Sequence, residues 1–393
     1  PPLAVAEIFD SRAVTLAHEA YDGENEIIGA DGIVGRLMAQ SIRHRGLWDV
    51  LSEVFMLNRG NAVYLRRIDR QDGARFGDLR ERFERAILLG FVRPGEIKPI
   101  LNPDPETVLG SDDLPIFLAR DHDDCVPGPV SGEFSTSPVV REAPREPAGG
   151  TLRVLLFGWS RKVPALLRQL GRYSNTTSEV DVVSGAPLAE READLANHAA
   201  EIDRVKLNHV VAGFSAPGVI EKLEPHRYSH VIVMASEILD DKEQADAISV
   251  TAALTLRGLF RERETHPDVM VELMDRETQN LFRGGHEDVI VSPAVVSYIV
   301  SQVALKRELA WVFWELTRPW GGQIELRDAA EYLNVSGEIR FEAVQRAASA
   351  WSEIALGLRR PRDGRDGLAP NPDRDAVWVL EPGDEVVVLT WIE

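Results

Sequence analysis

The sequence predicts an α/β protein in which a doubly wound parallel sheet is joined to small β-rich lobes. Between residues 150 and 270, short β-branched apolar runs alternate with helical stretches, as in a parallel sheet covered by helices on both faces. Blocks from the first 120 residues return in the same order after residue 270, which indicates a duplication. The first copy lacks the alternating segment, so we expect its sheet to be incomplete.

Composition narrows the class of protein. The 393 residues are 44% hydrophobic, and the single cysteine, Cys125, cannot form an internal disulfide, which fits a reducing compartment. Because there is no apolar run of about 18 residues, we expect a soluble chain. The net charge of −19 argues against a nucleic-acid partner and permits divalent cations.

The parallel sheet is predicted from β-branched, apolar segments between residues 150 and 270. The expected strands are 152–157, 180–184, 209–212 and 230–235, and the expected helices include 164–170 and 245–260.

The repeat begins with Val5–Asp10, which returns as Met270–Asp275, each a short apolar run that ends in acidic residues. We place these segments at the last sheet strand of each copy. The other matched blocks are Arg75-Phe76 with Arg340-Phe341, 86–90 with 352–357, Asn102-Pro103-Asp104 with Asn371-Pro372-Asp373, and 110–118 with 382–389.

A helical segment that is apolar on nearly every side follows in each copy, from Ile33 to Phe55 and from Val295 to Trp314. Such a surface exceeds what one small lobe can bury, so we expect burial in a core or between subunits. This predicts a multimer.

These patterns divide the chain into seven segments. We expect the last strands of the first Rossmann-like lobe at 1–30, crossover helices at 31–57, the first small lobe at 58–126, a Pro-rich linker at 127–150, the second Rossmann-like lobe at 151–292, crossover helices at 293–320 and the second small lobe at 321–393. Because a terminal strand alone cannot bury both faces, we also expect a part of the protein upstream.

The turn after the first strand of the complete sheet is Gly158-Trp159-Ser160-Arg161, where a dinucleotide fingerprint would lie. Only Gly158 remains of the fingerprint glycines. One reading is a modified nucleotide site in which Gly158, Ser160 and Arg161 hold an anion at the helix N-terminus. The other, which the missing glycines favour, is a turn that no longer binds cofactor, so NAD binding is not expected.

Acidic residues gather at strand ends, where open α/β sheets bind ligands. The candidates for a cation site are Asp121, Asp123, Asp124, Glu237, Asp240, Asp241, Glu272 and Asp275. Calcium prefers six to eight oxygen ligands, but none of these groups has EF-hand spacing, and solvated loops or helix caps are the alternative for each.

Catalytic patterns are missing from the sequence. The histidines are scattered without partners at metal-ligand spacing, and Ser160 is followed two residues later by Lys162 rather than glycine. We therefore expect a protein that is not an enzyme.

The order of sheet, crossover helix and small β-rich lobe, present twice, resembles tandem RCK (regulator of potassium conductance) domains. Residues 33–40 with Arg45-Gly46-Leu47, residues 100–104 and Pro127-Gly128-Pro129 resemble the middle region of the CASTOR/POLLUX ion channels. The turn at 155–161 is similar to the start of their second RCK unit.

The resemblance implies the regulatory part of a tetrameric cation channel on the cytoplasmic face of the membrane. It further implies a ring of RCK units that responds to Ca²⁺ and a transmembrane pore encoded upstream. Two alternatives remain: a peripheral regulatory subunit of a potassium transporter, and an NAD-dependent oxidoreductase with a degenerate fingerprint.

Overall fold

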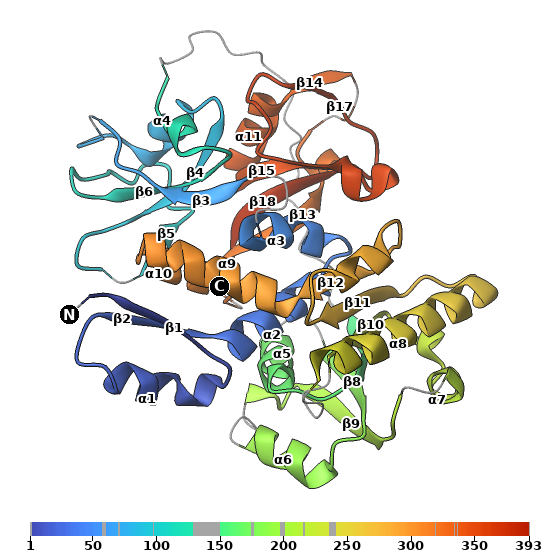
Figure 1. The fold of residues 1–393 in the computed structure, drawn as a ribbon. Helices are drawn as coiled ribbons and strands as arrows, with labels where there is room; N and C mark the ends of the chain where they lie inside the picture. Colours follow the sequence, from blue (N-terminus) through green and yellow to red (C-terminus); the bar gives the residue numbers. More distant parts are fainter. Residues whose placement is uncertain are drawn as a thin grey trace. The chain divides into compact units, whose positions relative to one another are not determined.

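The structure, a computed structural model, describes most of the chain (Figure 1). The described residues are 2–56, 60–69, 71–96, 98–128, 150–173, 177–196, 201–214, 217–235, 241–318, 320–333, 335 and 337–392. They form two compact units: residues 1–45 with 147–301, and residues 46–146 with 302–393. Most of the predicted linker, residues 129–149, lies outside the described residues.

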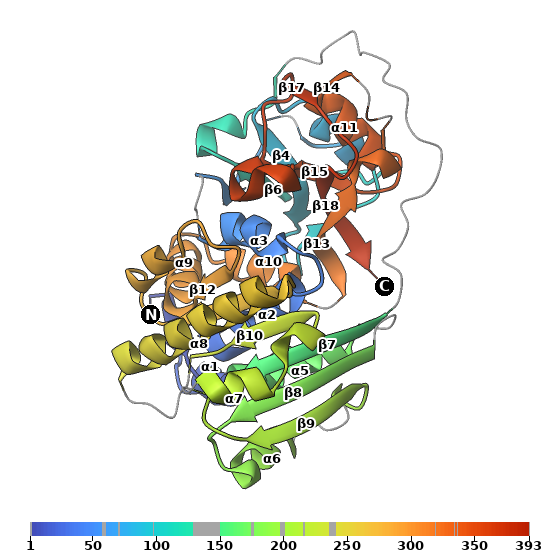
Figure 2. The same ribbon diagram turned by 90° about the vertical axis from the view of Figure 1, so that its right-hand side faces the viewer.

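The first unit contains a six-stranded sheet in which every neighbouring pair of strands is parallel. Its strand order is β12-β11-β10-β7-β8-β9, and Figure 2 shows β7, β8 and β9 side by side. The strands are β7 (Thr151–Phe157), β8 (Thr177–Ser184), β9 (Val205–Val211), β10 (His230–Val233), β11 (Asp268–Leu273) and β12 (Asp288–Val291). The predicted α/β fold with a parallel sheet is confirmed.

Helices connect these strands. They are α5 (Lys162–Gly171), α6 (Leu188–Ala196), α7 (Pro217–Lys222) and α8 (Lys242–Arg263). Helix α8 begins where the Asp241 carboxylate accepts the backbone N–H of Glu243 at 3.0 Å. It ends at Glu264, whose φ of 52° is left-handed and stops the helical hydrogen-bond pattern.

The strand that carries Glu272 is not the last of the sheet, so that expectation was wrong. Strand β12 pairs with β11 beyond it, from Met270–Asp288 to Leu273–Val291. Only four residues long, β12 continues directly into α9 (Ser292–Leu305), so in the sequence its apolar residues merge with those of the helix.

The beginning of the chain adds a separate parallel pair to the first unit, β1 (Ala4–Ile8) with β2 (Asn25–Gly29). A short 3-10 turn, η1 (Ser11–Ala13), and helix α1 (Val14–Glu19) lie between the two strands, and α2 (Ala30–Ser41) follows them. The two-stranded pair repeats the relation of β11 to β12, since in both cases a parallel strand leads directly into a long apolar helix.

The second unit contains two four-stranded antiparallel sheets of matching order, β3-β6-β4-β5 and β13-β18-β15-β16. The first is formed by β3 (Ala62–Leu65), β4 (Ala86–Val92), β5 (Ile100–Leu101) and β6 (Leu114–Ala119). The second is formed by β13 (Gly321–Asp328), β15 (Ile354–Arg359), β16 (Leu368–Pro370) and β18 (Glu385–Ile392). Helix α4 (Phe76–Arg80) precedes β4, and helix α11 (Phe341–Ser349) precedes β15, while β14 (Glu338–Arg340) pairs with β17 (Val377–Val379).

The two sheets also share an irregularity. The pairing register shifts between Leu88 and Gly90 in β4, and between Ala355 and Gly357 in β15. A Cβ atom at Gly90 would lie 2.0 Å from the Ile100 carbonyl oxygen, and one at Gly357 would lie 2.5 Å from that of Ala369. Glycine is therefore required at both positions because a neighbouring strand passes too close for any side chain.

Each long apolar segment consists of two helices rather than one. Residues 42–46 separate α2 from α3 (Leu47–Met56), and Gly46 adopts a φ of 81° there. Polar residues 306–308 separate α9 from α10 (Leu309–Leu316). The apolar side chains from Ile33 to Phe55 are buried within this single chain, so this segment does not support the prediction of a multimer. In α10, by contrast, Trp311 and Trp314 are 38% and 44% exposed.

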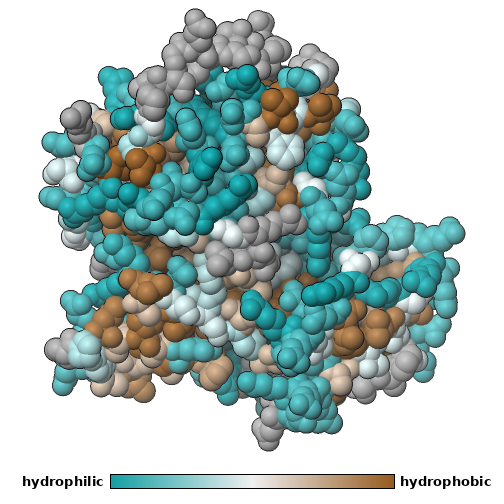
Figure 3. Space-filling model, turned by 45° about the horizontal axis from the view of Figure 1, so that its top comes forward, coloured by the Kyte–Doolittle hydropathy of each residue, from teal (hydrophilic) through white to brown (hydrophobic). Residues whose placement is uncertain are grey.

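Within the described residues, no helix combines the length and apolarity needed to cross a bilayer. On the face shown in Figure 3 the surface is mainly hydrophilic and is interrupted by separate hydrophobic clusters.

Candidate functional site

The carboxyl edge of the parallel sheet is a candidate ligand site. The chain order reverses between β7 and β10, which are neighbours in the sheet. In open α/β sheets, ligands bind in the crevice that this reversal opens. The predicted residues Gly158, Ser160 and Arg161 follow β7 at this edge.

Gly158 closes the turn between β7 and α5. Its φ is 99°, and a Cβ atom would lie 2.7 Å from the Met234 carbonyl oxygen. Its N–H donates to the Val183 carbonyl at 2.9 Å. The backbone conformation and the close approach of residue 234 thus account for glycine here. Whether NAD binds remains an open prediction.

The two residues after Gly158 are buried. The Trp159 side chain is 5% exposed, and its indole N–H donates to Asp194 Oδ2 at 3.1 Å. Ser160 is 1% exposed, and its Oγ accepts the backbone N–H of Lys162 at 3.3 Å. Both side chains thus make local hydrogen bonds, whereas Arg161 is exposed, and an anion site at Gly158, Ser160 and Arg161 stays a prediction.

Glu272 is fully buried and has three partners. Lys162 Nζ lies 3.1 Å from Oε1, and the Ser292 hydroxyl donates to the same oxygen. The backbone N–H of Ala235 donates to Oε2 at 3.2 Å. A buried carboxylate is tolerated when it is paired and hydrogen-bonded, as here. Glu272 therefore links β11 to α5 and α9 through an ion pair and hydrogen bonds, and its role as a cation ligand stays a prediction.

Other carboxylates at this edge accept hydrogen bonds from backbone N–H groups. Asp241 caps α8, and Asp275 Oδ1 accepts the N–H of Glu277 at 3.0 Å. Asp246 accepts the N–H groups of Met274 at 2.7 Å and Asp275 at 3.0 Å. Burial raises the pKa of Asp246, and these bonds partly oppose the rise.

The three aspartates after β6 also form local hydrogen bonds or ion pairs. Asp121 and Asp124 form a reciprocal capping box around η2 (His122–Asp124). Asp121 Oδ1 accepts the N–H of Asp123 at 2.8 Å, and the Asp123 carboxylate lies 3.2 Å from Arg66 Nη1. This explains three clustered aspartates by local structure alone.

In the part of the chain that the structure describes, no group of three His, Cys, Asp or Glu residues could hold a metal ion. Asp121, Asp123, Asp124, Asp241, Glu272 and Asp275 therefore do not form a calcium site among themselves. The remaining candidates, Glu237 and Asp240, lie outside the described residues.

A pocket of about 150 Å³ lies in the first unit, lined by residues of both its beginning and its second half. Three arginines and three aspartates line it, together with Ser11, Pro164 and Ala165: Arg12, Arg161, Arg168, Asp10, Asp31 and Asp194. Of the predicted cofactor residues, only Arg161 is part of it.

Internal pairing balances the charges of this pocket. Asp31 is 7% exposed and accepts the backbone N–H of Ser11 at 3.0 Å as well as its hydroxyl. Arg12 Nη1 lies 3.6 Å from Asp194. Hydrogen bonding to Arg12 lowers the pKa of Asp10, and burial lowers that of Arg168. With equal numbers of both signs, the pocket does not select one charge of ligand.

Sequence reasoning missed Lys162, Ser292 and Asp246, which hold the sheet edge together. A lysine at the first position of α5 and a serine at the first position of α9 carry no motif. Only their meeting with Glu272, at separations of 110 and 20 residues along the chain, reveals their role.

Comparison with known proteins identifies related sequences. A family model described as "Castor and Pollux, part of voltage-gated ion channel" matches residues 31–133. The probable ion channel CASTOR of Oryza sativa subsp. japonica is 25% identical over 403 residues, covering 93% of this chain and 44% of that protein. The ion channel CASTOR of Lotus japonicus is 26% identical over 387 residues, covering 88% and 44%. The chain thus spans less than half the length of these curated relatives.

Among solved structures, the human SLO3 gating ring matches with a TM-score of 0.72 at 14% identity. The match covers 99% of this chain and 81% of that one, so the two share a fold.

Proposed function

The chain is related to the CASTOR and POLLUX ion channels, and on that premise we propose that it is the regulatory gating-ring part of a ligand-controlled cation channel. The observation that carries the proposal is the agreement of sequence and fold over nearly the same residues. A relative called an ion channel aligns with 93% of the chain, and a gating-ring fold covers 99% of it.

In this proposal the chain contains two RCK-type units derived from one ancestor. The matching strand orders β3-β6-β4-β5 and β13-β18-β15-β16, with a register shift at Gly90 and Gly357, support a duplication. The first Rossmann-like lobe is represented by β1 and β2, and α2 and α3 are the crossover helices that follow it.

The proposed working form is a homo-oligomer, a tetrameric ring at the cytoplasmic face of the membrane that acts on a transmembrane pore. Its support is the exposed apolar surface of the second unit, where Leu305 is 82% exposed and Trp311 and Trp314 are also accessible. Aromatic residues are enriched at protein interfaces, and burying them would supply hydrophobic stabilisation.

Ca²⁺ is the regulatory ligand that the family resemblance suggests, and we retain it as a proposal. The net charge of −19 favours cation binding in general, since a bound divalent ion offsets repulsion between subunits. The described acidic residues do not supply a ready site, so any calcium ligands would include residues outside them or carboxylates from several subunits.

The test is electrical recording of the full-length protein that contains this chain, reconstituted in a planar bilayer. We expect a cation current whose open probability changes when Ca²⁺ is varied on the side facing this region. Deleting the region should remove the calcium response while leaving conduction. A full-length protein that conducts no ions would contradict the proposal.

A further inference from the structure

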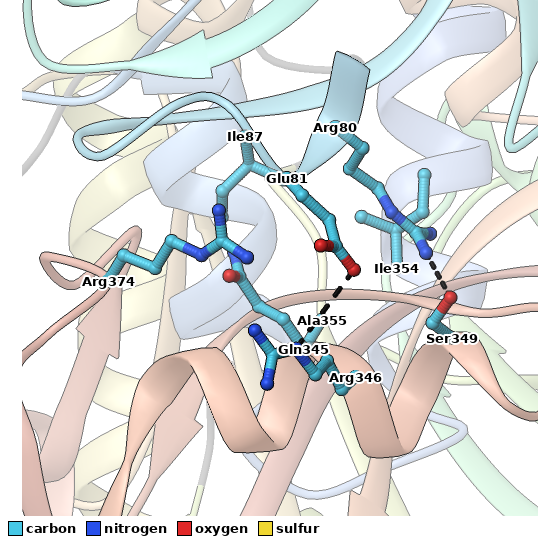
Figure 4. A pocket seen from close by; sticks show the side chains of 9 residues that line it. All are labelled: Arg80, Glu81, Ile87, Gln345, Arg346, Ser349, Ile354, Ala355 and Arg374. Atoms are coloured by element: carbon cyan, nitrogen blue, oxygen red, sulfur yellow. Dashed lines mark hydrogen bonds and ion pairs between the residues drawn. The ribbon is translucent and has the colours of Figure 1, made fainter. Parts of the chain in front are cut away.

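A second pocket lies in the second unit, where corresponding elements of the two small lobes meet (Figure 4). One lobe contributes Arg80 of α4, Glu81 directly after it and Ile87 of β4. The other lobe contributes Gln345, Arg346, Ser349, Ile354, Ala355 and Arg374. Glu81 contacts its own counterpart in the repeat, Arg346: each lies six residues after the arginine of the matched Arg-Phe pair. Equivalent parts of the two lobes therefore line the pocket.

The lining is rich in positive charge. Three guanidinium groups, those of Arg80, Arg346 and Arg374, surround one carboxylate, that of Glu81 (Figure 4). The Glu81 carboxylate is 4.0 Å from Arg346 Nε, which is long for an ion pair. Arg80 donates to the Ser349 hydroxyl, a neutral acceptor. The lining therefore contains three cationic side chains and one carboxylate.

Arg374 is the most unusual of these residues. It is 8% exposed, and its Nε has no hydrogen-bond partner among the described residues. The carboxylates of Glu81, Glu342 and Glu84 favour the charged form of Arg374, whereas the guanidinium group of Arg346 disfavours it. A buried cationic donor without a partner costs free energy, which an anion at the pocket would recover.

Burial lowers the pKa of Arg80 and of Arg374, because both guanidinium groups have lost most of their contact with water. Guanidinium groups nevertheless stay charged near neutral pH, so all three side chains remain cationic. Their planar N–H donors match the two oxygens of a carboxylate or phosphate.

The size of the pocket limits the ligand. Its volume of about 20 Å³ accommodates a species the size of one water molecule. Because the Glu81 side chain at its edge is 43% exposed, the rest of a larger ligand can remain in solvent.

We propose that this pocket binds the oxyanion head of a small ligand, a phosphate or carboxylate oxygen held by Arg80, Arg346 and Arg374. The bound anion would tie the two lobes together, because its ligands come from both. This inference does not depend on the proposed channel function, since it concerns only the second unit.

The experiment is a thermal melting series of the purified chain in sodium phosphate, with sodium chloride at matched ionic strength as the reference. We expect phosphate to raise the melting temperature saturably, as a ligand that binds only the folded state must. Sodium acetate forms a second arm, and a shift with acetate as well would identify the carboxylate as the recognised head. Equal shifts in phosphate, acetate and chloride would overturn the proposal.

Variants assign the site. Arg374→Gln should weaken phosphate binding about tenfold, as expected for one charge-assisted hydrogen bond. Arg120→Gln removes the same charge from an exposed position outside the pocket and should leave binding unchanged. Arg80→Gln provides an independent variant if Arg374→Gln does not fold. Unaltered phosphate binding in the folded pocket variants would rule out this site.

Discussion

Asn102 and Asn371 hold equivalent places in the two small lobes, and each donates its side-chain amide to a backbone carbonyl of the opposite lobe. Asn102 Nδ2 lies 2.6 Å from the Ser352 oxygen, and Asn371 Nδ2 lies 2.8 Å from the Arg85 oxygen. Both asparagines have a φ of 45°, and both backbone N–H groups donate at 2.8 Å, to Leu89 and Leu356 respectively. Arg85 lies five residues before Gly90, and Ser352 lies five residues before Gly357, the glycines at the register shifts of β4 and β15.

This reciprocal pair predicts the effect of removing either amide. Asn371→Ala should lower the free energy of unfolding by about 1–3 kcal/mol, since it removes the bond to the half-buried Arg85 carbonyl and strains a left-handed backbone. Asn371→Gly removes the same bonds without the strain, so it should be less harmful than the alanine variant. Urea denaturation measures both. Equal stability of the wild type and both variants would show that the pair contributes nothing.

The buried pair of Lys162 and Glu272 predicts strong coupling. Lys162→Met should destabilise the first unit by about 3–5 kcal/mol, because the Glu272 carboxylate would remain buried without its counter-charge. Combining Lys162→Met with Glu272→Gln should restore part of that loss. Chemical denaturation of the four proteins in a double-mutant cycle gives the coupling, and additive effects would contradict the pairing.

The carboxylate of Glu287 predicts a dependence of stability on pH. Arg257 Nε and Nη2 each lie 2.7 Å from one of its oxygens. Burial raises the pKa of Glu287, but the bonds from Arg257 outweigh it, and the net pKa lies below the ordinary 4.5. The folded state therefore binds this proton less tightly than the unfolded state does, so the stabilisation is present above the unfolded pKa.

As pH falls through the depressed folded pKa, that stabilisation is lost. The wild type should exceed Glu287→Gln in stability at pH 7, and the difference should shrink below the ordinary pKa of 4.5. Urea unfolding at several pH values measures this. Glu262→Gln, at an exposed position of α8, is the matched control and should show no such difference. A difference that is constant down to pH 3 would exclude the linkage.

Calcium binding is predicted from the family resemblance and the acidic charge. If Ca²⁺ binds the folded chain, its melting temperature should rise with calcium concentration, whereas an equal rise with magnesium would indicate charge screening. Asp241→Asn keeps a residue able to cap α8, so a smaller calcium shift in that variant would report a lost ligand. Asp123→Asn with Asp124→Asn tests the other cluster. Superimposable melting curves through the millimolar range would refute calcium binding.

The exposed tryptophans of α10 predict self-association. Trp311→Glu with Trp314→Glu should shift the purified chain toward smaller species in light scattering, because buried charge opposes an apolar interface. The matched control is Val108→Glu, which places a charge at an exposed position of the first small lobe and should leave the size of the species unchanged. Trp351→Glu would not serve as a control, because the indole nitrogen of Trp351 is buried. A wild-type chain that remains monomeric at micromolar concentration would contradict the prediction.

The sequence by itself determined that there is a parallel sheet and which segments form five of its six strands. Alternating runs such as 152–157 and 230–235 are recognisable because a buried parallel strand needs consecutive apolar residues on both faces. The repeat was also readable, since the bulge glycines Gly90 and Gly357 and the asparagines Asn102 and Asn371 perform the same geometric task in each copy.

Only the tertiary structure decided what the charged residues do. Asp121, Glu272 and Asp275 look alike in the sequence, yet one caps a turn, one pairs with Lys162 in the core and one caps the segment after β11. The pocket lined by Arg80, Arg346 and Arg374 could not be predicted from the sequence either. Arg80 and Arg374 are 294 residues apart in the chain and share no motif, and their common surroundings arise only when the two lobes pack. Local patterns record which residues must be apolar or flexible, whereas the partner of a charge depends on the fold as a whole.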